Sequence, residues 1–176
     1  MLCVVGIDGM AYLDNIMYVV CHGSSKIRLY NTDTLSPLDV VIDVKGMTYP
    51  RDIVACRHDR QLYVAEALDI WRVSADDHSY VKWLTTASIG NKMTLHLSLR
   101  SRRLLLTTSR LPRTVREYST TNKELRAIEL PQYVQRCHAA DLTGHSTYIV
   151  SHEGTLQDER QDAVSELFRF CHVLQH

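Results

Sequence analysis

Residues 49–73 read YPRDIVACRHDRQLYVAEALDIWRV, and this stretch decides the fold. Two short apolar runs, which begin at Ile53 and Leu62, are separated by the charged segment CRHDR, and a third run begins at Ile70. Apolar and polar residues alternate within the runs, which is typical of β-strands. The charged segment is therefore either an active-site loop between strands or a turn within one unit of a repeated scaffold.

The strand that contains Tyr63 recurs along the chain. IMYVVCHG, QLYVAEA, RLLLTTS and STYIVSHEG share one shape, and their anchor residues Tyr18, Tyr63, Leu105 and Tyr148 are 45, 42 and 43 residues apart. An alternating strand with an arginine follows each anchor: KIRLYNTDT, DIWRVSADD, TVREYSTTN and ELFRF. One apolar run precedes each anchor, and a further run closes three of the units. The repeat predicts a unit of about 43 residues with four short strands.

Four short strands in a unit of this length are the pattern of a β-propeller blade. The sequence therefore predicts an all-β chain, a β-propeller-like array of four-stranded antiparallel blades with about 3.5 to 4 units. A sandwich of short strands is the alternative, but it does not explain the regular spacing. The expected units are 7–46, 47–90, 91–133 and 134–171, within one propeller segment over residues 1–176. Residues 156–170 have the composition of a helical turn or two.

The second unit resembles an NHL-type propeller repeat. The matching features are Pro50 leading into Ile53, the strand residues 63–65, the acidic Glu66 and the IWR strand. The other units match this family in hydrophobic rhythm only. Because NHL-type propellers are typically six-bladed, the resemblance implies a fragment of a larger propeller. Alternatively, residues 2–6 supply the missing outer strand of the last blade and close a four-bladed ring.

Composition excludes some classes of partner. The formal net charge is zero, so the chain as a whole has no attraction for nucleic acid or an anionic membrane. No apolar window is long enough to span a bilayer, and the first residues lack the basic region of a signal peptide. Five scattered cysteines fit a reducing compartment better than a disulfide framework. We therefore expect a cytoplasmic protein.

An arginine-rich stretch is the one candidate for binding nucleic acid. It contains Arg100, Arg102, Arg103, Arg110, Arg113 and Arg116. In an antiparallel blade, the two turns that carry most of these residues fall on opposite faces, whereas a phosphate-tracking groove needs its charges together. We expect solvated turns, and RNA binding of the NHL type stays a second alternative function.

Three polar residues are candidates for a metal site. His22 and His152 each follow their anchor by four residues, and Glu66 occupies a neighbouring position. These strand ends lead to one rim, where metal-dependent propeller hydrolases and lyases gather histidines and carboxylates. Polar loop residues are the favoured interpretation, because the third unit offers only Thr108 and Ser109 there. No catalytic motif is present, so we predict no catalytic residue and no cofactor.

The last unit has the longest loop, over residues 153–166. Long loops on a rigid scaffold are frequent binding sites, and the mixed charge here favours a protein partner. The candidate contacts are Glu153, Asp158, Glu159, Arg160 and Asp162. The predicted function is a non-enzymatic protein–protein interaction scaffold with an unknown protein partner; the alternative is a metal-dependent propeller hydrolase or lyase.

Overall fold

A computed structural model describes most of the chain. The backbone is described for residues 6–66, 68–85, 93–98, 103–108, 114–130, 135–141, 148–154 and 168–174. Side chains are described for residues 6–66, 68–85, 103–107 and 114–130. Within these ranges the regular structure consists of β-strands, and no helix is present that could span a bilayer.

The strands form four antiparallel sheets, which we call blades 1 to 4. Blade 1 contains β1 (Ile7–Leu13), β2 (Ile16–Cys21), β3 (Lys26–Asn31) and β4 (Pro37–Asp43). Blade 2 contains β5 (Asp52–Cys56), β6 (Gln61–Ala65), β7 (Asp69–Ser74) and β8 (Tyr80–Thr85). Blade 3 contains β9 (Met93–Ser98), β10 (Arg103–Thr108), β11 (Thr114–Ser119) and β12 (Glu124–Glu129). Blade 4 contains β13 (Gln135–Asp141), β14 (Tyr148–Gly154) and β15 (Phe168–Leu174).

The repeat seen in the sequence corresponds to these sheets. The four anchors lie in the second strand of each blade, and the arginine-bearing runs form the third. The prediction of an all-β array of four-stranded antiparallel blades with 3.5 to 4 units is confirmed. The predicted helical turn is wrong at residues 168–170, which pair with β14 as strand β15, and residues 156–167 lie outside the described part of the chain.

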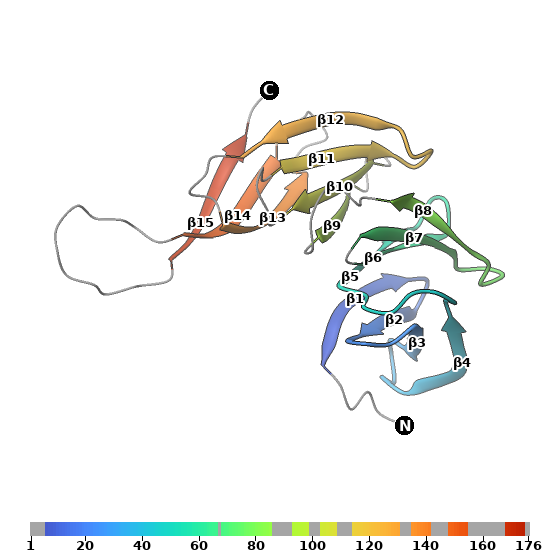
Figure 1. Ribbon diagram of the computed structural model, residues 1–176. Helices are drawn as coiled ribbons and strands as arrows, with labels where there is room; N and C mark the ends of the chain where they lie inside the picture. The colour runs from blue at the N-terminus through green and yellow to red at the C-terminus, as the bar shows by residue number, and fades with distance from the viewer. Residues whose placement is uncertain are drawn as a thin grey trace.

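The blades follow one another along an arc (Figure 1). The first strands of successive blades contact each other in the order β1, β5, β9 and β13. In Figure 1 the arc does not return from blade 4 to blade 1. The sheet of blade 4 consists of β13, β14 and β15. Ring closure by residues 2–6 cannot be followed, because residues 1–5 lie outside the described ranges.

The apolar core lies between neighbouring blades. One cluster joins blade 1 to blade 2 and includes Leu13, Tyr18, Ile53 and Leu62. A second joins blade 2 to blade 3 and includes Tyr63, Ile70, Trp83, Leu104 and Tyr118. Each apolar layer between two blades is thus built from the side chains of both sheets, because side chains alternate between the two faces of a strand.

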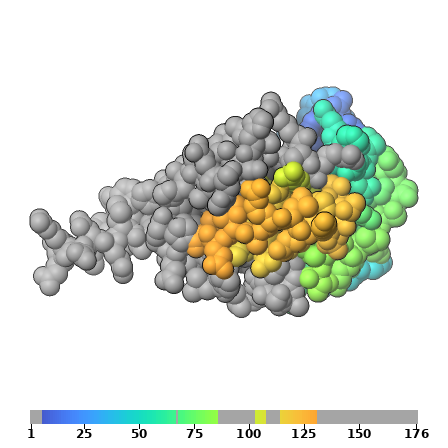
Figure 2. Space-filling model, turned by 90° about the horizontal axis from the view of Figure 1, so that it is seen from above, coloured from blue at the N-terminus to red at the C-terminus, as the bar shows by residue number. Residues whose placement is uncertain are grey.

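The two tryptophans of blade 2 pack on its opposite faces. Trp71 belongs to the cluster with blade 1, whereas Trp83 belongs to the cluster with blade 3. Trp83 Nε1 donates to the Thr120 carbonyl at 3.2 Å, and Asn122 Nδ2 donates to the Trp83 carbonyl at 2.7 Å. These bonds hold the β11–β12 turn of blade 3 against β8, and Figure 2 shows the two segments in contact (orange and green). Both tryptophans thus pack neighbouring blades together.

A glycine sets the closest approach of two inner strands. Gly9 lies at a bulge in β1, and a Cβ atom there would be 2.9 Å from both Asp52 Cα and Ile53 N of β5. Real Cβ atoms do not come this close to backbone, so a larger residue would push β1 away from β5.

Candidate functional site

The CRHDR segment forms the turn between β5 and β6. Arg60 Nε contacts Asp76 Oδ1 at 2.5 Å, and Arg60 also forms an ion pair with Asp14 of blade 1. His58 Nδ1 lies 3.2 Å from Asp59 Oδ1. The charges of this turn therefore pair with neighbouring turns and bridge two blades. We interpret the segment as a corner of the scaffold.

Glu66 is buried at the end of β6, where its side chain is 6% exposed. One carboxylate oxygen, Oε1, accepts hydrogen bonds from Thr48 N at 2.6 Å, from Thr48 Oγ1 at 2.6 Å and from Tyr49 N at 3.0 Å. The other, Oε2, accepts one from Trp71 Nε1 at 2.9 Å. Four donors thus surround the carboxylate, and their hydrogen bonds hold the connection between β4 and β5 against the core of blade 2.

The environment of Glu66 keeps it ionised. Burial alone would raise the pKa of this carboxyl, because a buried charge loses its hydration. The bonds from Thr48, from Trp71 and from the Tyr49 amide favour the charged form more strongly, and the pKa lies below its ordinary value. This arrangement uses the carboxylate to hold backbone and leaves little room for a metal.

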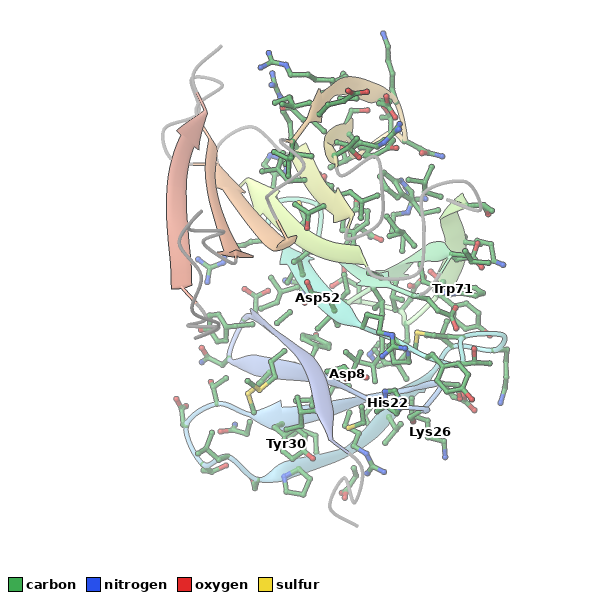
Figure 3. The ribbon with its side chains drawn as sticks, turned by 60° about the vertical axis from the view of Figure 1, so that its left-hand side comes forward. Asp8, His22, Lys26, Tyr30, Asp52 and Trp71 are labelled. Atoms are coloured by element: carbon green, nitrogen blue, oxygen red, sulfur yellow. The ribbon has the colours of Figure 1, made fainter. Side chains whose placement is uncertain are left out.

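The candidate His22 lies near Glu66 but is engaged elsewhere. His22 Nδ1 is 3.1 Å from Asp8 Oδ2, and its ring contacts Tyr49 with centroids 5.9 Å apart. Figure 3 shows Asp8 and His22 side by side. The third candidate, His152, pairs with Phe170 in the β14–β15 ladder, and its side chain is outside the described part. Within the described residues, no group of three histidine, cysteine or acidic side chains could hold a metal.

The arginine-rich stretch is partly neutralised within blade 3. Arg103 Nη1 contacts Glu117 Oε1 at 2.6 Å, and Arg116 Nη1 contacts Glu124 Oε2 at 2.8 Å. The other four arginines, Arg100, Arg102, Arg110 and Arg113, lie outside the described residues. The two arginines that can be placed are thus held by carboxylates of their own blade.

The candidate partner-binding loop is mostly outside the described residues. Glu153 lies in β14, where it pairs with Arg169 of β15. Asp158, Glu159, Arg160 and Asp162 fall within residues 155–167, of which the structure describes nothing. The contribution of this loop to binding stays a prediction.

The cysteines differ from the expectation. Cys21 is disulfide-bonded, so the prediction of unpaired cysteines is wrong at this position. Cys56 is free and buried, and burial raises the pKa of its thiol.

A polar pocket of about 550 Å³ lies between blades 2 and 3. Its floor is the outer half of the blade 2 sheet, with Gln61, Tyr63, Arg72 and Ser74. The rim carries Asp59 and Asp77 from two turns of blade 2, and Thr120 and Thr121 of the β11–β12 turn form a wall. This volume is within the range of small-ligand sites, which is about 300–1,000 Å³.

The pocket was not predicted, although the sequence carries one sign of it. The residues paired with the anchors Tyr18, Tyr63 and Leu105 are Leu29, Arg72 and Glu117. Leu29 of blade 1 belongs to the core between blades 1 and 2, but the equivalent residue of blade 2 is the charged Arg72. An arginine at a core position of a repeat indicates a gap in the packing.

Comparison with known proteins identifies a fold and no family. No family profile matches the sequence, and no curated protein matches it either.

Solved structures do match. One of them, a chain of the crystal structure of a nidogen/laminin complex, superposes with a TM-score of 0.69 at 12% sequence identity. The match covers 84% of this chain and 57% of that chain. At this identity the similarity concerns the fold alone. Together with the sheet topology, it establishes a β-propeller-like fold for this chain.

Proposed function

We propose that this chain is a non-enzymatic protein-binding module whose partner packs an apolar sheet face against blade 1. The surface concerned is the side of blade 1 that points away from blade 2, which we call the unpacked face. Its residues are Met10, Tyr12, Met17, Val19, Arg28, Tyr30 and Val41.

Strand pairing defines the unpacked face. One cross-strand row runs Met10, Val19, Arg28, Val41, and the next runs Tyr12, Met17, Tyr30, Pro37. The corresponding rows of blade 2 are Ile53, Val64, Trp71, Lys82 and Ala55, Leu62, Val73, Tyr80. The two faces therefore have equivalent positions in the repeat.

Exposure separates the two equivalent faces. Leu62, Val64 and Val73 of blade 2 are fully buried, because blade 1 covers them. On the unpacked face, Met10 is 59%, Tyr12 is 53% and Val41 is 43% exposed, whereas Val19 between them is buried. In Figure 3, Tyr30 lies on the side of blade 1 remote from Trp71.

Contiguous exposed apolar residues on one sheet face mark interaction surfaces. Since a sheet face covers the equivalent positions of blade 2, a partner with an apolar sheet face fits best. The unpacked face is the observation that carries the proposal. The matched chain comes from a complex of two proteins, which is a property of that protein and agrees with a binding role here.

No observation favours the alternative functions to the same degree. A metal-dependent hydrolase or lyase would need a ligand cluster, which is absent among the described residues. The two carboxylate oxygens of Glu66 accept hydrogen bonds from four donors of the protein. For RNA binding, the two arginines of the arginine-rich stretch that can be placed, Arg103 and Arg116, are paired with carboxylates. We also propose that blade 2 is an NHL-type repeat, supported by Pro50, residues 63–65 and Glu66.

Site-specific photocrosslinking tests the binding role. The photoreactive residue p-benzoylphenylalanine is placed at Tyr12, on the unpacked face, in cells that express the protein natively. We expect a discrete crosslinked protein, which mass spectrometry then identifies. The matched control carries the same residue at Leu35, which is 68% exposed in the β3–β4 turn and lies off the unpacked face.

A second substitution makes the test specific. Met10→Asp places a charge beside Tyr12 on an exposed position, so the fold tolerates it but the apolar contact does not. The crosslink from Tyr12 should then disappear. Equal crosslinking from Tyr12 and Leu35 would contradict the proposal. A crosslink to a second copy of the chain would show that the unpacked face mediates self-association and does not bind a different protein.

A further inference from the structure

The pocket between blades 2 and 3 contains an arginine that forms no ion pair with another described residue. Arg72 lies on the pocket floor and is partly buried. Within the described part of the chain, its guanidinium has no hydrogen bond or ion pair. The equivalent Glu117 of blade 3, in contrast, contacts Arg103 at 2.6 Å and Arg126 at 4.0 Å.

A guanidinium that has no partner in the protein keeps its donors available for a ligand. Its planar fork fits a carboxylate with two parallel hydrogen bonds. Gln61, which also lies on the pocket floor, has no side-chain hydrogen bond among the described residues either. The floor therefore offers a cation and an amide to a ligand from outside.

The rim has the opposite charge. Asp59 and Asp77 enter the lining from the β5–β6 and β7–β8 turns. Asp77 accepts hydrogen bonds from Ser79 N at 3.0 Å and from Ser79 Oγ at 2.8 Å. Bonds from Ser74 and Ser79 lower the pKa of Asp77 to about 2, so it stays ionised at any physiological pH.

One positive charge on the floor and two negative charges on the rim select the ligand. A phosphate dianion or a cluster of acidic residues that reached Arg72 would be repelled by Asp59 and Asp77. A ligand with a carboxylate at its tip and a basic group beside it satisfies both. The hydroxyls of Thr120 and Thr121, on the wall, are suited to bond a peptide backbone.

We propose that this pocket binds a peptide segment in which an acidic side chain is followed by a basic one, with the carboxylate on Arg72 and the basic group between Asp59 and Asp77. The site is separate from the unpacked face of blade 1, so the two proposals can fail independently.

The test is a titration followed by NMR. The probe is the blocked tetrapeptide acetyl-Gly-Glu-Lys-Gly-amide, added to the full chain labelled with ¹⁵N. We expect saturable shifts of the Arg72 Nε–Hε signal and of the Thr120 and Thr121 amides. The Glu-Glu and Lys-Lys peptides of the same length should bind at least about tenfold more weakly, the change expected for loss of one charged hydrogen bond.

Variants assign the charges. Arg72→Gln should weaken the Glu-Lys peptide about tenfold, whereas Lys26→Gln, at an exposed position in the third strand of blade 1, should leave its affinity unchanged. Asp77→Asn should weaken the Glu-Lys peptide but leave a Glu-Gln peptide unaffected. A folded Arg72→Gln spectrum confirms that the loss is local.

Three results would overturn the inference. They are the absence of saturable shifts, equal affinity for the three peptides, and binding that survives Arg72→Gln unchanged. Tighter binding of inorganic phosphate than of the Glu-Lys peptide would also overturn it, because the site would then be an anion site.

Discussion

Blade 2 has two faces that differ more than its single pattern of alternation suggests. Toward blade 1 it presents Ile53, Leu62, Val64, Trp71 and Val73, all buried. Toward blade 3 the inner half is apolar, with Ala65 and Ile70, but the outer half carries Gln61, Arg72 and Ser74 around the pocket.

One strand shows the difference clearly. In β7, Trp71 and Val73 point to the packed side, whereas Ile70, Arg72 and Ser74 point to the other. Alternation decides which face a side chain occupies. Whether that face is filled depends on what the neighbouring blade presents. The junction of blades 1 and 2 is thus filled by apolar side chains, whereas the outer half of the junction of blades 2 and 3 leaves a polar pocket.

The largest expected effect concerns the packed side. Glu66→Ala removes the acceptor of four hydrogen bonds and leaves their donors buried. Breaking a buried charged network costs about 3–5 kcal/mol. Urea unfolding followed by tryptophan fluorescence measures the loss. A cost below about 1 kcal/mol, the value of one ordinary hydrogen bond, would show that Glu66 is dispensable to the junction.

Glu66→Gln separates charge from shape. The amide can still accept on one oxygen, but its nitrogen faces the Trp71 donor, so we expect a loss of about 2 kcal/mol at neutral pH. A folded-state pKa below the ordinary value of 4.5 stabilises the protein above pH 4.5. This stabilisation is lost as the pH falls through the folded-state pKa. The difference between wild type and Glu66→Gln should therefore shrink below pH 4.5. A constant difference would exclude a contribution from ionised Glu66.

A pair of adjacent residues tests the two faces directly. Leu62 is fully buried toward blade 1, whereas Gln61 lines the pocket. Leu62→Ala should cost about 3 kcal/mol, because it leaves a cavity in the core. Gln61→Ala should stay within about 0.5 kcal/mol of wild type. Equal costs, measured by the same unfolding experiment, would show that both faces contribute alike.

The junction of blades 2 and 3 should show an alkaline dependence. Burial and the hydrogen bond to Glu124 raise the pKa of Tyr118 to about 12. A raised folded-state pKa provides stability below the ordinary value of 10, and this stability is lost as pH rises toward the folded-state value.

Tyr118→Phe removes this contribution. At neutral pH we expect a loss of about 1 kcal/mol, from the hydrogen bond of 2.9 Å to Glu124. Between pH 10 and pH 12 the variant should lose less stability than the wild type. Parallel alkaline limbs in the two unfolding series would contradict the raised pKa. Tyr18, whose pKa is also raised, stays in both proteins and cancels in the comparison.

The smallest effect is expected at the turn between the blades. Arg60 bridges Asp14 and Asp76, but all three side chains are well exposed. Exposed ion pairs contribute little, and salt screens them. Arg60→Ala should change the urea midpoint only slightly, and the change should vanish in 1 M sodium chloride. A large, salt-independent loss would show that the turn locks blades 1 and 2 together.

Much of the fold was predictable from the sequence, because period-two runs with a spacing near 43 residues encode both the strands and their repetition. Tyr18 and Tyr63 identified the second strands correctly. The helical composition around residue 168 misled, since strand pairing with β14 overrides a weak local preference.

The candidate sites were less predictable, because they depend on contacts between distant segments. Glu66 was only a candidate metal ligand, with a polar loop residue as the favoured interpretation, and no pattern pointed to its donors Thr48 and Tyr49 in the preceding connection. The pocket beside Arg72 arises from the spacing of two blades. The disulfide bond at Cys21 left no sign in cysteine spacing.

The glycine in β1 bears on how strongly the array curves. Gly9 pairs with Val20, and the equivalent positions in blades 2 and 3 are Asp52 and Thr94. Because a Cβ at Gly9 would collide with β5, the first junction depends on a residue that the later blades lack. The angle between neighbouring blades determines how many of them complete a circle. The curvature of the array therefore depends on single residues of the inner strands, and a methyl group at residue 9 would widen the angle between blades 1 and 2.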